Sequence, residues 1–155
     1  MIACDEDAGN VSDFTGNEMV YNLTSDPVYY TGSGTVTVRE RVDQGVTIDI
    51  AMDPTGSGGS HPAHLHYSTF DIPDTPMAAM LIPVDATTGV SSTTIYEFLD
   101  ETKVTYNDLM AFDGSIKVHL DDGANSKVVI AATNIGINAK IDINDIAECS
   151  EKQPI

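Results

Sequence analysis

Short runs in which apolar and polar residues alternate, separated by Gly, Pro, Asn or Asp, extend along most of this 155-residue chain. Successive side chains of a β-strand point to opposite faces, so each run predicts a strand with one buried face. The clearest case is a pair of Val- and Ile-rich runs at 34–42 and 46–50, which flank Asp43-Gln44-Gly45 and predict a β-hairpin. Further strands are expected at 64–70, 78–84, 93–99, 115–120, 127–133 and 139–143.

About eight or nine short strands at this spacing predict an all-β domain, either a sandwich or a barrel. One segment, at residues 105–112, departs from the alternation. Thr105 suits the position before a helix, and Asp108 follows three places on. Leu109 and Phe112 are spaced for one helical face. We therefore expect one short helical turn in an otherwise antiparallel β fold.

The length is that of one ordinary domain, which can bury a core without a metal or a disulfide. Residues 1–15 are acidic and small and show no period, so they are interpreted as a flexible leader. The sandwich is expected to span 16–145, and 146–155 to form a C-terminal tail.

Acidic residues outnumber basic ones by 24 to 7, which gives a net charge of −17. Phosphate backbones and anionic membranes would repel such a surface, so nucleic acid is excluded as a partner. No run of about 18 apolar residues occurs, so nothing in the sequence is expected to span a bilayer. Membrane attachment is expected only through a lipid anchor.

The chain has two cysteines, Cys4 and Cys149, one near each end. The opening Met1-Ile2-Ala3-Cys4 resembles the end of a bacterial lipoprotein signal, in which the cysteine is acylated. The placement of the two cysteines also suits a disulfide that joins the termini in an oxidising compartment. The two interpretations exclude one another, but both predict an extracellular or cell-surface location.

Three of the four histidines lie within six residues, in His61-Pro-Ala-His64-Leu-His66, and the fourth is His119. Alternation in a strand places His64 and His66 on one face, and a neighbouring strand with His119 would supply a third nitrogen. Imidazole-rich sites suit copper and zinc, with His61 as an optional fourth ligand. Ligation requires neutral imidazoles, so bound metal is expected to leave as the pH falls through about 6.5. The alternative is that these histidines only pack and form hydrogen bonds.

A series of short motifs resembles the chordin-type (CHRD) domain family over roughly residues 32–140. The motifs, in order, are His61-Pro-Ala-His-Leu-His66, Leu81-Ile-Pro-Val-Asp85 with Gly89-Val-Ser-Ser-Thr93, Leu109-Met-Ala-Phe-Asp-Gly114, Ile116-Lys-Val-His119 and Val129-Ile-Ala-Ala-Thr-Asn-Ile-Gly136-Ile-Asn138. The resemblance implies an immunoglobulin-like sandwich and mainly extracellular roles.

CHRD domains are themselves similar to copper/zinc superoxide dismutases, and this likeness implies that His64, His66 and His119 correspond to copper ligands. The chain departs from the dismutase pattern in two respects. It has no histidine between 67 and 118 to bridge a second metal, and no arginine late in the chain to attract superoxide. The acidic surface would also oppose an anionic substrate. Full dismutase activity is therefore not expected.

Three hypotheses follow. The first is an exported module that binds copper or zinc through His64, His66 and His119, with His61 assisting. The second is a copper oxidoreductase with a reduced site of the superoxide dismutase type. The third is a structural or adhesive surface subunit without metal, which associates with itself or with a partner protein through an exposed edge strand.

Overall fold

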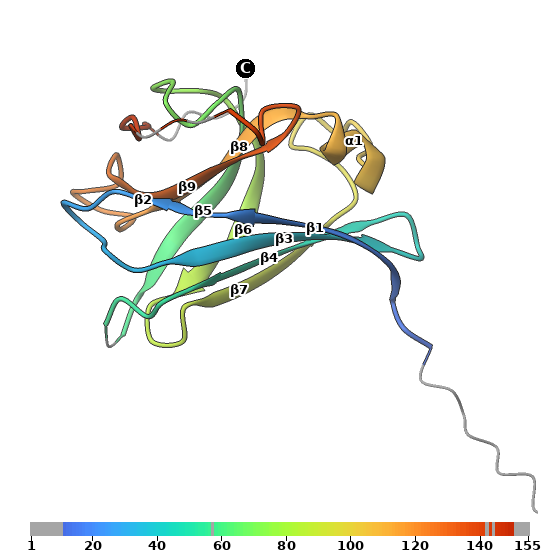
Figure 1. Cartoon of the computed structure of the whole chain (residues 1–155), viewed down its shortest axis with the longest axis horizontal. Coiled ribbons are helices and arrows are strands. Elements are labelled where there is room, and N and C mark those ends of the chain that lie inside the picture. The colour runs from blue at the N-terminus through green and yellow to red at the C-terminus, as the bar shows by residue number, and fades with distance from the viewer. Residues whose placement is uncertain (1–10, 57, 142, 144, 151–155) are drawn as a thin grey trace, which may run out of the picture.

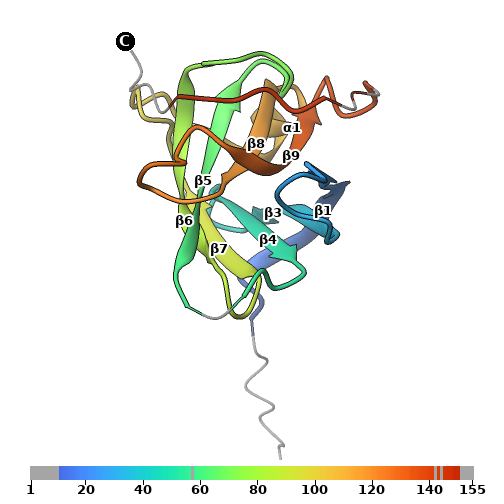
Figure 2. The same cartoon turned by 90° about the vertical axis from the view of Figure 1, so that its left-hand side faces the viewer.

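The computed structural model describes residues 11–56, 58–141, 143 and 145–150, and in this range it consists of two antiparallel sheets packed face to face (Figures 1 and 2). One sheet has the order β1-β3-β4-β7, formed by β1 (Phe14–Asn22), β3 (Gly34–Arg41), β4 (Val46–Met52) and β7 (Val90–Ile95). The other has the order β2-β9-β8-β5-β6, formed by β2 (Thr24–Ser25), β9 (Val129–Gly136), β8 (Asp113–His119), β5 (Ser60–Tyr67) and β6 (Met77–Asp85). The predicted all-β sandwich is thus confirmed.

The core lies between the two sheets and follows the period-two pattern. In the predicted hairpin, β3 pairs with β4 from Gly34↔Met52 to Glu40↔Val46 across the expected turn. The inward residues Val36 and Ile48 are fully buried. Removing such branched apolar side chains from water is the main term that stabilises the sandwich.

The predicted helical turn is present as α1 (Tyr106–Met110). The Thr105 side chain accepts a hydrogen bond from the Asp108 backbone N–H, and the Asp108 carboxylate accepts one from the Thr105 N–H. This reciprocal capping satisfies two backbone donors that a helix leaves open at its start. Leu109 faces the core and is fully buried.

Two predictions about the ends of the chain differ from the structure. Strand β1 begins at Phe14, so it reaches two residues into the segment predicted as a leader. The sequence pattern did not predict this strand, because six consecutive residues from Thr15 to Val20 are exposed and show no alternation of apolar and polar side chains. The strand predicted at 139–143 is absent from the described residues there, since the chain turns after Gly136, which has a φ of 64°.

The described part of the predicted C-terminal tail packs against the sandwich rather than extending from it. Cys149 is fully buried and belongs to a small apolar cluster with Phe70, which follows β5, and with Val129 and Ala132 of β9. Its backbone N–H donates to the carbonyl of Lys127. Residues 146–150 are therefore part of the domain. Cys4 lies outside the described residues, so the disulfide and the lipid anchor both stay predictions.

No helix in the described part of the chain has the length and apolar character that crossing a bilayer requires.

A glycine in the β6 to β7 turn provides a test of this fold. Gly89 has a φ of 74°, and a Cβ there would collide with the carbonyl oxygen of Met52. We expect Gly89→Ala to lower the free energy of unfolding by about 1–3 kcal/mol, because both the backbone conformation and the contact disfavour a side chain. Gly123→Ala is the matched control, since a Cβ there meets nothing closer than Asp121 Oδ1 at 3.8 Å. Equal thermal unfolding midpoints for the two variants would contradict this turn geometry.

Candidate metal site

Strand β5 directs two histidines to the outer face of the second sheet. Its alternate residues Ala63 and Leu65 belong to the buried core between the sheets. His64 and His66 therefore point away from that core, as the alternation predicted. Both are nevertheless buried, with 3% and 0% of their surface exposed.

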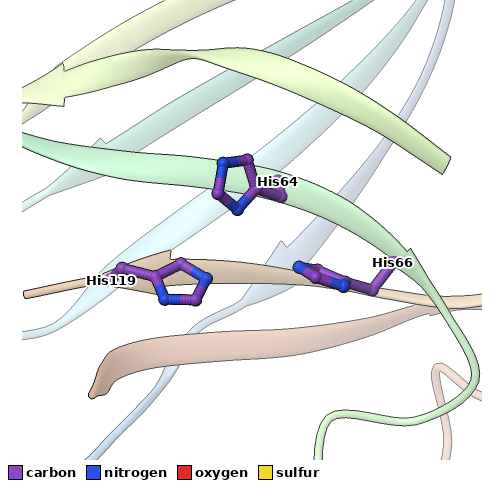
Figure 3. A group of neighbouring side chains, drawn as sticks. All are labelled: His64, His66 and His119. Carbon is purple, nitrogen blue, oxygen red and sulfur yellow. The ribbon is translucent and has the colours of Figure 1, made fainter. Parts of the chain in front are cut away.

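His119 joins them from the adjacent strand. β8 pairs with β5 in the register Ala63↔Val118, which brings His119 beside the two β5 histidines. The ring centroids of His64 and His119 lie 5.0 Å apart, and those of His64 and His66 lie 5.7 Å apart. One ring nitrogen from each of the three histidines lies within 4.8 Å of the others. Figure 3 shows the rings of His66 and His119 turned toward the space below His64.

Backbone carbonyls fix the tautomers of two of these rings. His66 Nδ1 lies 2.9 Å from the carbonyl of Thr75, and His119 Nδ1 lies 2.7 Å from the carbonyl of Ser126. A carbonyl only accepts hydrogen bonds, so each Nδ1 carries a proton, and in the neutral ring the lone pair is on Nε2. His66 Nε2 is buried without a hydrogen-bond partner. This is the arrangement in which an imidazole binds a metal through Nε2.

His61, predicted as an optional fourth ligand, does not join the group. Its Nδ1 lies 2.8 Å from the carbonyl of Leu120, and its Nε2 lies 2.5 Å from the Thr55 hydroxyl. Nδ1 must donate to the carbonyl, so the Nε2 lone pair accepts from Thr55 and no ring nitrogen is left for a metal. His61 instead links the start of β5 to the residue that follows His119. The group of possible ligands found in the described residues therefore consists of His64, His66 and His119 without His61.

The outer face is covered by segments that the sequence pattern did not identify. The loop at 68–76 and the C-terminal residues 145–150 lie close together in both views (Figures 1 and 2) and are joined by hydrogen bonds from Ala147 N to Phe70 O and from Ser150 N to Asp74 Oδ1. Cys149 Sγ lies 3.9 Å from His66 Nδ1. Both segments thus contact the His66 ring, through the Thr75 carbonyl and through Cys149 Sγ.

Lys117 is a further buried residue on this face that sequence reasoning missed. It is fully buried, and it precedes His119 by two positions on β8. The period-two rule that grouped His64 with His66 also places Lys117 beside His119, so the signal was present. Burial lowers the pKa of Lys117, and the Cys149 thiol and the Asp71 and Asp74 carboxylates oppose this shift.

Burial also keeps the histidines neutral. It lowers the pKa of His64 to about 4, with a smaller contribution from repulsion by His119. It lowers the pKa of His66 to about 3, although the bond to the Thr75 carbonyl favours the charged ring. Both imidazoles therefore stay unprotonated, as metal ligation requires, well below the ordinary histidine range.

Comparison of the chain with protein-family models, curated proteins and solved structures gives no significant match. The resemblance to CHRD domains therefore stays a prediction, and the arguments about function depend on the site itself.

The depressed histidine pKa values predict a loss of stability in mild acid. Unfolded histidines bind protons below about pH 6.5, while folded His64 and His66 do not until about pH 4 and 3. The unfolded state thus gains protons first, and stability falls as the pH drops from about 6.5 toward 4. Each pKa unit corresponds to about 1.4 kcal/mol, so the loss should reach a few kcal/mol.

Urea unfolding of the metal-free protein at successive pH values measures this loss of stability. His64→Gln should flatten the slope of the free energy of unfolding against pH. A slope that His64→Gln leaves unchanged would contradict this assignment.

Proposed function

We propose that this chain is a metal-binding β-sandwich that holds one copper or zinc ion through His64, His66 and His119. The observation that carries the proposal is the convergence of three buried imidazoles, with ring nitrogens within 4.8 Å of one another. Two of the rings are held by backbone carbonyls through Nδ1, which favours the tautomer with the lone pair on Nε2. Histidines that only packed and formed hydrogen bonds would not need to bring three ring nitrogens together.

The spacing of the three nitrogens fits an ion with a small adjustment. Ligands 2.0–2.1 Å from a tetrahedral ion lie about 3.4 Å apart. The nitrogens here lie within 4.8 Å of one another, so at that limit the rings close by somewhat more than an ångström when an ion binds. The largest separation is between the rings of His66 and His119, whose centroids lie 6.3 Å apart.

The donor set favours copper or zinc over the harder cations. Three imidazoles and no carboxylate make up the group found in the described part of the chain. Calcium and magnesium prefer oxygen ligands, whereas imidazole nitrogen suits zinc and copper. The protein supplies three ligands, so a water or another small ligand would complete the shell. A bound ion would act as a Lewis acid or, if it is copper, as a one-electron carrier.

We further propose that the domain works outside the cytoplasm, as a secreted or surface-anchored module of CHRD type. The lipoprotein-like context of Cys4 and the net charge of −17 support this placement. Mass spectrometry of the protein from its native source tests it, because an acylated Cys4 would add the mass of the lipid.

Metal content provides the first test of the binding proposal. Protein purified without added metal and then dialysed against Zn²⁺ or Cu²⁺ should bind about one ion per chain, measured by elemental analysis. His66→Ala should abolish this binding, because it removes one of the three ligands. His61→Asn is the matched control, since both His61 nitrogens are occupied and an asparagine amide can still donate to Leu120. Equal loss of metal in the two variants, or none in either, would contradict the assignment.

The pH at which metal leaves provides a second test. The sequence alone predicted release near pH 6.5, but burial lowers the pKa of His64 to about 4 and that of His66 to about 3. Protons therefore compete for these nitrogens only in stronger acid, and metal should be retained down to about pH 5. Measuring bound metal after dialysis at successive pH values checks this, and complete release at pH 6.5 would count against buried ligands.

A further inference from the structure

Lys117 lies on the outer face of β8, on the same side as His119, and none of its surface is exposed. Burying an ammonium group away from water is costly unless it is held by hydrogen bonds. Its place beside three candidate metal ligands makes the cost harder to explain, since a positive charge there repels a metal cation. The contacts of its Nζ atom indicate what it does.

The ammonium binds the loop that covers the site. Lys117 Nζ donates to the carbonyl of Ile72 and to the hydroxyl of Thr75, each at 3.1 Å. Both acceptors belong to the loop between β5 and β6. Lys117 therefore fastens this loop to the middle of the second sheet.

Thr75 connects the hydrogen bonds of Lys117 to the metal site. The same residue whose hydroxyl accepts from Lys117 uses its carbonyl to accept the proton of His66 Nδ1, at 2.9 Å. A shift of Thr75 would free His66 to rotate or to change tautomer. Partners of this kind, behind a metal ligand, typically contribute 10–100-fold in metal affinity.

We propose that Lys117 is a positioning residue for the metal site, which holds Thr75 in place and through it orients the Nε2 lone pair of His66. The inference rests on the proposed metal binding. The proposal predicts the direction in which metal affinity changes when Lys117 is replaced, because the charge and the contacts of Lys117 have opposite effects on that affinity. The charge of Lys117 repels a bound cation. If that charge were its only effect on the site, replacing Lys117 with an uncharged residue would tighten metal binding. Its contacts orient a ligand, so a positioning role means that removing it weakens binding.

Lys117→Met decides between the two, because methionine is apolar and comparable in length but cannot donate to Thr75. Affinities for Zn²⁺ and Cu²⁺, measured in parallel by competition with a chromophoric chelator, should fall about 10-fold or more. The His66 Nδ1–H signal in the NMR spectrum of the metal-free protein should also exchange faster with water. Lys103→Met is the matched control, since Lys103 is exposed and pairs with Glu97, and it should change neither quantity.

Apo stability separates positioning from a general loss of structure. Replacing a buried charge with an apolar group of similar size is often neutral or stabilising, so Lys117→Met should fold as well as the wild type by circular dichroism. Thr75→Val is the second variant, because it removes the hydroxyl and keeps the carbonyl, and it should weaken binding in the same direction. If Lys117→Met fails to fold, the metal affinity of Thr75→Val tests the positioning role instead.

Unchanged or tighter binding in the folded variants would overturn the positioning role while leaving the metal site intact. A wild-type protein that binds neither ion would instead refute the proposed function.

Discussion

Two hydrogen bonds, from His66 Nδ1 to Thr75 and from His119 Nδ1 to Ser126, organise the outer face of the second sheet. Each joins a strand side chain to the backbone of a loop, so each fixes a ring and a covering segment together. Burial lowers the pKa of His64 and His66 and so keeps these rings neutral, and the bonds to the carbonyls favour the tautomer with the lone pair on Nε2. Burial, protonation and orientation at this site thus have one common cause.

The site and the core stabilise the protein separately. The core lies between the sheets and consists of apolar side chains such as Val36, Ile48 and Leu65. The histidines lie on the opposite side of β5 and β8, so a substitution there leaves the packing between the sheets intact. Their burial lowers stability in acid, because neutral rings cannot take up protons that the unfolded chain binds. A bound metal would offset this by binding the folded state alone.

The charges of the protein act on two scales. The net charge of −17 creates a field that attracts cations from a distance. Close to the rings, the one buried ammonium among the described residues, Lys117, opposes a cation. The charge of Lys117 does not explain why it is buried here, but its hydrogen bonds to the loop at 68–76 do.

The sequence by itself determined the class of fold, the hairpin at β3 and β4, the capped turn α1 and the shared face of His64 and His66, because each follows from local periodicity or capping. It did not reveal β1, whose exposed residues show no alternation, or the packing of Cys149, which depends on contacts far along the chain. Only the tertiary structure decided that His61 is occupied on both nitrogens and that Lys117 is buried. A strand pattern specifies which face a side chain takes, but which loop closes over that face depends on the folded chain.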